Sequence, residues 1–173
     1  MSERLLSDGV IALRPWTQAD APEIVACIDG DEDIARWLDQ VPQPYSLADA
    51  KTYIAGIGEQ AYAVTDAVSG RVLGSIGLRW NDPHDVAEVG YWLRNDARGR
   101  GVTTRALALV STVAFEQGAA RVQLRAAVGN IASRRVAERA GFTLEGVLRS
   151  AHWSPRLQER LDWAMYSLLA DER

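Results

Sequence analysis

The sequence predicts one α/β domain built on a single mixed β-sheet. Residues 86–93 have the β-branched and aromatic content of a strand, and an amphipathic helix follows the glycine-containing segment 98–104. A second strand-to-helix unit covers residues 121–140, and residues 62–65 and 72–78 are typical of a hairpin. Strands that alternate with helices in one part of the chain and follow one another directly in another part indicate a mixed sheet.

The elements nearest the N-terminus follow from patterning and capping signals. Residues 10–14 are the predicted first strand. Capping-box patterns at 17–20 and 46–49 start helices that reach about residues 28 and 58. Asp31 is placed to cap a short helical turn between these two helices. The first half of the domain is therefore expected to contribute one strand and two main helices before the hairpin.

Turn signals organise the rest of the chain. Ser69-Gly70 is expected to turn the hairpin, and Asn81-Asp82-Pro83 to turn the chain into the next strand. The last two strands are predicted at 142–148 and 162–169, with His152-Trp153-Ser154-Pro155 in the connection between them. No linker or internal repeat interrupts the sequence, so residues 1–173 are predicted to form a single domain.

The composition indicates a soluble globular domain. The 173 residues are 47% hydrophobic and 24% charged, which suits one domain with a sizeable core. A net charge of −4 argues against a general nucleic-acid-binding surface and suits an amine-bearing partner. The single cysteine, Cys27, continues an apolar helix face and is expected in the core. The absence of a signal-peptide pattern and of a membrane-spanning apolar run predicts a cytoplasmic protein without membrane contact.

The segment 98–104 has the features of an anion site. Gly99 and Gly101 lack a Cβ, so a ligand can approach the main chain closely. The first amides of the following helix lack intrahelical acceptors and lie at the positive end of its dipole. Arg98 and Arg100 can add charge-assisted contacts to a phosphate or pyrophosphate. The alternative is that the two glycines only make a tight turn.

A second motif, Asn-x-x-Ser-Arg-Arg-Val-x-Glu-x-x-Gly-Phe at 130–142, accompanies the Arg-Gly-x-Gly segment. Together the two motifs resemble the GCN5-related N-acetyltransferase (GNAT) family, and in particular its ribosomal-protein, RimJ/RimL-like branch. Further segments resemble that branch in the same order along the chain, at 13–15, 89–93, 144–149 and 165–169. The resemblance covers nearly the whole sequence.

The resemblance implies a GNAT fold, with a mostly antiparallel twisted sheet of about seven strands flanked by about four helices. It also implies acetyl-CoA as donor and a primary amine as acceptor, with direct attack on the thioester and no metal. The donor-binding residues that it implies are Trp92, Leu93 and Arg94 for the pantetheine arm, Arg98, Gly99, Arg100, Gly101, Val102, Thr103 and Thr104 for the pyrophosphate, and Asn130. Thr103 departs from the Gly or Ala that is usual in the family.

Leaving-group stabilisation is assigned to Ser133. Asn130, Ser133 and Ala137 lie at i, i+3 and i+7 and so on one helix face. Many relatives carry a tyrosine at the position of Ala137 that protonates the departing thiolate, and the ribosomal-type branch resembles this sequence in using serine at the Ser133 position. The alternative role for Asn130 and Ser133 is helix capping.

The proton acceptor has two candidates. At pH 7 a lysine amine carries a deprotonation penalty of roughly 4–5 kcal/mol and an α-amine only about 1–1.4 kcal/mol, so an α-amine needs little base catalysis. Glu88 shares a strand face with Gly90 and Trp92. His152 stands where the ribosomal branch can carry a glutamate, and imidazole titrates near neutrality. Each could instead be an ordinary surface charge.

Two of the six tryptophans are candidates for the acceptor cleft. Trp37 and Trp153 flank breaks in the predicted structure, and in this fold those segments border the acceptor, so two aromatic rings there could clamp a peptide or a planar group. Ordinary packing is the alternative. Trp16, Trp80 and Trp163 lie in or beside regular elements and are expected in the core.

Two functional hypotheses follow. The first is an acetyl-CoA-dependent N-acetyltransferase acting on a protein N-terminal α-amine or on an amine-bearing small molecule or antibiotic. The second is a non-catalytic acyl-CoA-binding module, which the absent tyrosine and Thr103 would suit. Neither hypothesis involves nucleic acid or a membrane, and both leave a homodimer open.

Overall fold

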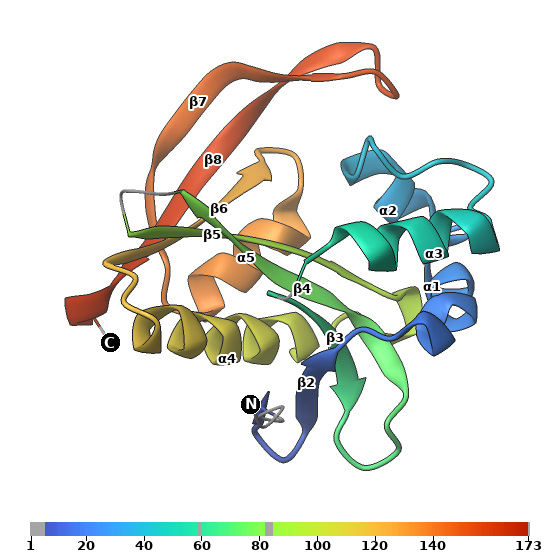
Figure 1. The fold of residues 1–173 in the computed structure, drawn as a ribbon. Helices are drawn as coiled ribbons and strands as arrows, with labels where there is room; N and C mark the ends of the chain where they lie inside the picture. The colour runs from blue at the N-terminus through green and yellow to red at the C-terminus, as the bar shows by residue number, and fades with distance from the viewer. Residues whose placement is uncertain (1–5, 59, 82–84, 173) are drawn as a thin grey trace.

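The computed structural model describes residues 6–58, 60–81 and 85–172. They form one sheet with the strand order β1-β2-β3-β4-β5-β6-β8-β7 (Figure 1). The strands are β1 (Leu6–Ser7), β2 (Ile11–Pro15), β3 (Ala61–Asp66), β4 (Val72–Asn81), β5 (Val86–Leu93), β6 (Arg121–Ala127), β7 (Thr143–Ser154) and β8 (Glu159–Leu169). The β5–β6 pair is parallel and the other neighbouring pairs are antiparallel. The mixed, mostly antiparallel sheet is thus confirmed.

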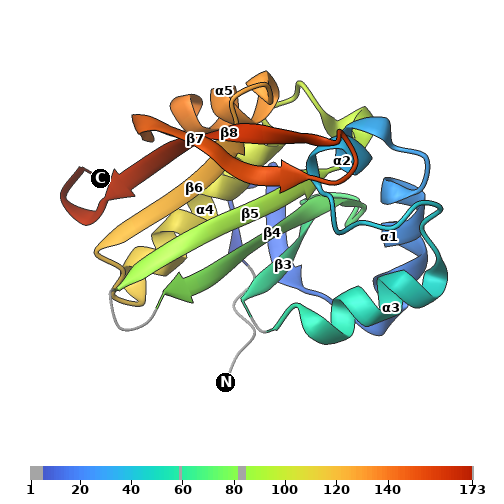
Figure 2. The same ribbon diagram turned by 90° about the horizontal axis from the view of Figure 1, so that it is seen from above.

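Helices lie on both sides of this sheet (Figure 2). They are α1 (Ala21–Ile28), α2 (Glu32–Trp37), α3 (Leu47–Gly56), α4 (Val102–Glu116) and α5 (Ile131–Arg139). The main core joins α4 to one face of the sheet through residues such as Val89, Val110 and Leu124. A second core, which includes Ile24 and Trp92, joins α1 and α3 to the other face. Strand alternation explains the division, since Val89 and Trp92 point to opposite faces of β5.

The sheet splits between its two parallel strands. The described pairing of β5 with β6 covers Val86–Glu88 and Arg121–Gln123. Beyond it, β5 continues beside β4 through Leu93, while β6 continues beside β8. The two strands diverge over the rest of their length (Figure 1). The β6-facing edge of β5 therefore has main-chain groups that pairing with β6 does not use.

The predicted helix starts are confirmed by their caps. Asp31 Oδ1 accepts a hydrogen bond from the amide of Ile34 at 2.9 Å at the start of α2. Ser46 and Asp49 form a reciprocal capping box at the start of α3. Ahead of α1, a carboxylate oxygen of Asp20 accepts from the Thr17 amide at 2.9 Å. The short polar patterns in the sequence thus specified where the helices that flank the second core begin.

Two strand predictions were wrong. The short strand β1 was not anticipated and adds an eighth strand to the sheet. Strand β7 runs through Ser154, so His152, Trp153 and Ser154 belong to a strand and not to a connection, and the turn follows at residues 155–158. Most of β7 is exposed on both faces, which removes the apolar alternation that marks a strand. The predicted turn at 81–83 includes residues 82 and 83, which lie outside the described residues.

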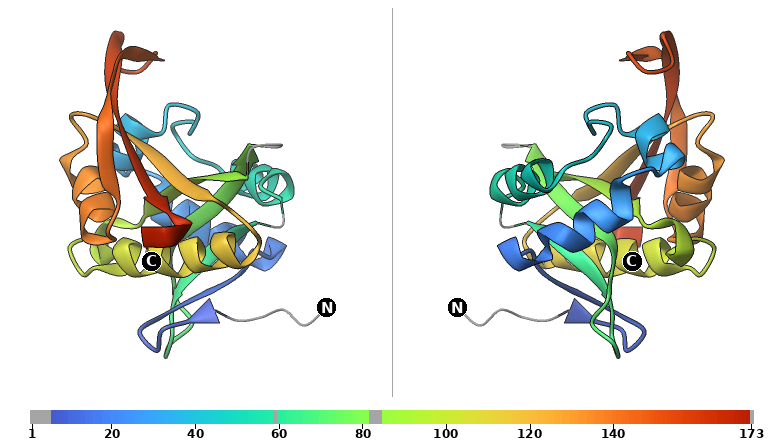
Figure 3. Two further views of the ribbon diagram at one scale, coloured as in Figure 1. Left: turned by 90° about the vertical axis from the view of Figure 1, so that its left-hand side faces the viewer. Right: turned by 90° about the vertical axis from the view of Figure 1, so that its right-hand side faces the viewer.

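The β7–β8 hairpin projects from the sheet, and its tip reaches over α2 (Figures 1 and 3). Cys27 is buried as predicted, and burial raises the pKa of its thiol to about 11, so it stays protonated at neutral pH. Among the described residues, no helix is both long and apolar enough to cross a membrane.

Candidate active site

The glycine segment opens α4 beside the split in the sheet. Gly99 and Gly101 have φ angles of 73° and 74°, a left-handed conformation that glycine adopts readily. Gly101 is the N-cap of α4, and no side-chain hydrogen bond caps this helix. A Cβ built at either glycine would meet no atom within 4 Å. The main chain at these two glycines is therefore open to a ligand, and the first amides of α4 can meet an anion there.

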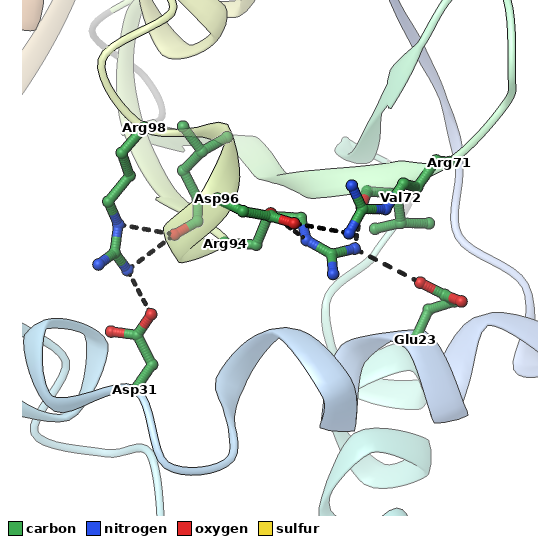
Figure 4. Close-up of polar contacts among 8 residues, drawn as sticks. Glu23, Asp31, Arg71, Val72, Arg94, Asp96 and Arg98 are labelled. Carbon is green, nitrogen blue, oxygen red and sulfur yellow. Dashed lines mark hydrogen bonds and ion pairs between the residues drawn. The ribbon is translucent and has the colours of Figure 1, made fainter.

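Arg94 and Arg98 hold this segment in place (Figure 4). The Arg98 guanidinium donates to the carbonyl oxygen of Leu93 at 2.9 Å and to Asp31 at 2.6 Å. Arg94 pairs with Asp96 at 2.7 Å and donates to the carbonyl oxygen of Val72 at 3.0 Å. Both guanidinium groups thus connect the end of β5 to neighbouring elements. Their side chains support the anion-binding segment and are already engaged with protein acceptors.

The other side chains of the segment 98–104 differ in how far they are buried. Arg100 is exposed, and its side chain makes no hydrogen bond or ion pair with the part of the chain that the structure describes. Val102 and Thr103 are buried, and Thr104 is half-buried. The side chain of Thr103 is therefore accommodated inside the protein. Of the two arginines expected at a phosphate, Arg100 is the more exposed, and its charge acts on the nearby Asp66 carboxylate, whose pKa it helps to lower.

Asn130 and Ser133 begin α5 on the other side of the split. The Asn130 side chain accepts from the Ser133 amide at 3.1 Å, so it caps the helix, which was the alternative role. The Ser133 hydroxyl lies 2.8 Å from the Tyr91 hydroxyl of β5. Ala137 is fully buried in the main core. The helix face predicted from the sequence therefore has one hydroxyl, that of Ser133, held against β5.

Tyr91 is a functional candidate that sequence reasoning missed. Burial raises its pKa to about 12, against the opposing effect of the Ser133 hydrogen bond, so its hydroxyl stays protonated. The Tyr91 hydroxyl has two acceptors within reach, Ser133 Oγ at 2.8 Å and the Ser133 carbonyl oxygen at 3.3 Å, and the serine proton is free for a ligand when Tyr91 donates to Oγ. The strand alternation that put Glu88 and Trp92 on one face already placed Tyr91 on the other, toward α4 and α5.

Glu88 is saturated with donors. Its carboxylate accepts from Arg125 at 2.6 Å, from Arg79 at 2.8 Å and from Gln123 at 3.1 Å. Burial alone would raise the pKa of Glu88, but these hydrogen bonds outweigh burial and hold the pKa below its ordinary value. The side chain is 13% exposed. A carboxylate in this environment is a weak proton acceptor.

His152 belongs to a separate cluster between the hairpin and the segment after α2. Its Nε2 lies 2.5 Å from a carboxylate oxygen of Asp39, and its ring stacks on Trp163 with centroids 4.9 Å apart. Trp163 in turn lies beneath the Arg125 guanidinium at 4.6 Å. Trp163 is thus half-buried between polar groups, and its predicted core position was wrong. Asp39 was also missed, since nothing in the sequence marks its contact with a residue far along the chain.

The two tryptophans predicted at the acceptor cleft have different surroundings. Trp37 lies beside Gly129 and lines a cavity of about 340 Å³ with residues of α2, the end of β6 and the hairpin. Trp153 is 49% exposed. It alternates with His152 and Ser154 along β7, and so points to the side opposite Asp39. Trp16 and Trp80 pack against the two cores, as predicted.

A sheet that splits after a short parallel pairing, with an uncapped helix start beside the split, is the architecture of an N-acetyltransferase. A family model described as "Acetyltransferase (GNAT) domain" matches residues 11–143. The chain belongs to this family and is an N-acetyltransferase.

The similar proteins agree with this assignment. The chain is 31% identical to the Bacillus subtilis (strain 168) protein named "Putative ribosomal N-acetyltransferase YdaF" over 171 residues, which cover 94% of this chain and 92% of that protein. A GNAT-family acetyltransferase from Bacillus anthracis has a TM-score of 0.88 at 17% identity, covering 98% and 100% of the two chains. RimL, named a ribosomal L7/L12 alpha-N-protein acetyltransferase and solved with coenzyme A, has a TM-score of 0.81 at 22% identity, covering 98% and 100%.

Proposed function

We propose that this protein transfers the acetyl group of acetyl-CoA to the α-amine of a protein N-terminus. The observation that carries the proposal is the uncapped, glycine-opened start of α4 beside the split between β5 and β6. The resemblance of the chain to proteins named for ribosomal N-acetylation favours a protein acceptor over a small amine-bearing molecule.

The residues present fit coenzyme A. The open left-handed glycines and the first amides of α4 suit a pyrophosphate, and Arg100 can add a charge-assisted contact. The main-chain edge of β5 beyond Glu88, which β6 leaves unpaired, can hydrogen-bond the amides of a pantetheine arm. Arg94 and Arg98 act by fixing the geometry of the segment.

Ser133 is placed to stabilise the leaving thiolate. Ser133 lies in the first turn of α5, beside the split in the sheet. Its hydroxyl is 2.8 Å from the Tyr91 hydroxyl, which holds it in place. Direct attack by the amine nitrogen forms the C–N bond while the C–S bond breaks, and its electron pair stays on sulfur. A donor that strengthens its hydrogen bond as charge develops on sulfur lowers the barrier and leaves donor affinity nearly unchanged.

His152 is the preferred proton acceptor for the attacking amine. The three donors on Glu88 oppose its protonation, whereas His152 lies at the hairpin with one ring nitrogen engaged by Asp39. An α-amine loses its proton at low cost near neutral pH, so one modest base suffices. Glu88 then serves to hold Arg125 and Gln123 across β6.

Release of free CoA from acetyl-CoA tests the proposal. A panel of peptide N-termini, aminoglycosides and aminoacyl-nucleotides is offered, and the expected result is release with peptides, together with acetylation of the peptide α-amine by mass spectrometry. Release only with small amines would replace the protein acceptor by a small molecule. Acetyl-CoA binding without release by any amine would instead support the acyl-CoA-binding module.

A further inference from the structure

The contact between His152 and Asp39 determines which imidazole nitrogen is available. Asp39 follows α2 and His152 lies near the end of β7, so the contact joins residues 113 positions apart. A carboxylate has no proton to donate at neutral pH, and so Asp39 must accept from Nε2–H. When the ring is neutral, its proton is then on Nε2, and Nδ1 carries the free lone pair.

The Asp39 carboxylate is itself held from β7. Its second oxygen accepts from the Ser154 hydroxyl at 2.9 Å, and Ser154 is fully buried. Ser154 Oγ also accepts from the Leu157 amide at 3.2 Å, inside the turn of the hairpin. Because His152 and Ser154 are two residues apart on one strand, they present one face to Asp39. Both carboxylate oxygens are thus directed at β7.

The other neighbours fix the ring and supply no competing hydrogen bond to it. Trp163 stacks on the imidazole with an interplanar angle of 21°. Arg125 lies over Trp163 and donates to Glu88, so this cation is committed elsewhere. Among the described residues the charged groups near His152 include Asp39 in direct contact, and Arg125 and Glu88 beyond Trp163. On the paired strand of the hairpin, Asp162 accepts from the Ser150 amide and Arg160 donates to the Ser150 carbonyl oxygen, so both are already engaged.

We propose that Asp39 is a positioning residue that fixes His152 with its proton on Nε2, so that Nδ1 accepts the proton lost by the attacking amine. The proposal rests on the proposed function of His152 as the base. The amine nitrogen bonds to the acetyl carbon and gives its proton to Nδ1, while the thiolate takes its stabilising hydrogen bond from Ser133. The imidazolium that forms keeps its Nε2–H bond to Asp39.

The tautomer is tested without any assay of activity. The chain has two histidines, so in a His84→Gln variant the imidazole ¹⁵N spectrum reports His152 alone. We expect the Nε2–H tautomer almost exclusively in the folded neutral protein, and in Asp39→Ala only the weaker Nε2–H preference of a solvated imidazole. An Nδ1–H tautomer, or a tautomer population that Asp39→Ala leaves unchanged, would overturn the proposal whether or not His152 is the base.

A double-mutant cycle tests the role in catalysis. We expect Asp39→Ala to lower kcat/KM for a peptide amine at least tenfold at pH 7, to lower it less at pH 9, and to keep the affinity for acetyl-CoA within twofold. The control Asp171→Asn, which removes an exposed carboxylate from the turn after β8, should leave kcat/KM unchanged. In a His152→Ala background the effect of Asp39→Ala should disappear.

The outcomes of the cycle are distinguishable. An equal loss from Asp39→Ala with and without His152 would show that Asp39 only supports the fold, and would overturn the proposal. No loss from His152→Ala alone would instead refute the proposed base, while the tautomer measurement would still report on the Asp39 contact.

Discussion

The hydroxyl groups of Tyr91 and Ser133 are the residue-scale feature to which the proposed function gives a chemical role. The two side chains come from β5 and α5, on opposite sides of the split in the sheet, and meet at 2.8 Å. Tyr91 stays protonated because burial raises its pKa to about 12. Either hydroxyl can donate in this pair, and Ser133 has a proton for a developing thiolate when Tyr91 donates to Ser133 Oγ.

Replacing Ser133 by alanine should lower kcat about 100-fold, because one preorganised donor to the transition state is lost. The dissociation constant of acetyl-CoA, measured by calorimetry, should change less than twofold. Tyr91→Phe should lower kcat about tenfold, since it removes a support of Ser133 and leaves the serine hydroxyl in place. If Ser133→Ala lost stability and kept its kcat, Ser133 would belong to the helix cap alone.

The ion pair between Glu145 and Arg121 should make the stability of the fold depend on pH in the acid range. Hydrogen bonds from Arg121 and Ser167 lower its pKa to about 2. Since the folded pKa lies below the unfolded value, the pair stabilises the protein above the unfolded pKa, and this stabilisation is lost as pH falls toward 2. The carboxylate is 40% exposed, which limits its contribution to less than about 1 kcal/mol.

Glu145→Gln should therefore be less stable than the natural chain in urea unfolding at pH 7. The difference should remain near pH 5 and shrink as pH is lowered toward 2, where about half of the folded natural chain has a neutral Glu145. A difference that stays constant over this pH range would mean that packing, and not charge, accounts for the effect.

In the proposed function, donor binding depends on the start of α4. Arg94 and Arg98 tie the preceding segment to β4 and α2, and Gly99 and Gly101 then leave the main chain open to a ligand. The sequence predicted this element well, because a strand, two glycines and an apolar helix face are local signals. It could not show that Arg98 is engaged by Asp31, since that contact depends on how α2 packs.

Gly101→Val should weaken acetyl-CoA binding at least tenfold, or about 1.4 kcal/mol, because a side chain would enter the space used by the pyrophosphate. Gly70→Val is the matched control. Gly70 has a φ of 73° and open space around it, as Gly101 has, but it lies in the β3–β4 turn. Calorimetry that finds equal donor affinity for both folded variants would remove the glycine segment from the site.

At the scale of the whole molecule, contacts between residues far apart in the sequence bring the candidate site residues together. Helix starts and most strands were predictable from capping residues and apolar periodicity, which act over a few residues. The extent of β7 was not, since its exposed faces hide the alternation and its pairing with β8 defines it. Asp39 and Tyr91 were missed because their partners lie 113 and 42 residues away in sequence.

The preference between amines tests the central claim most directly. Two matched peptides are compared with acetyl-CoA at pH 7 and pH 9, one with a free α-amine and no lysine, the other with a blocked N-terminus and one lysine. The account predicts that the α-amine peptide has the higher kcat/KM at pH 7, because its amine is neutral at roughly 3–4 kcal/mol lower cost, and that the advantage shrinks toward pH 9. A clear lysine preference at pH 7, unchanged in Glu88→Gln and His152→Ala, would contradict it.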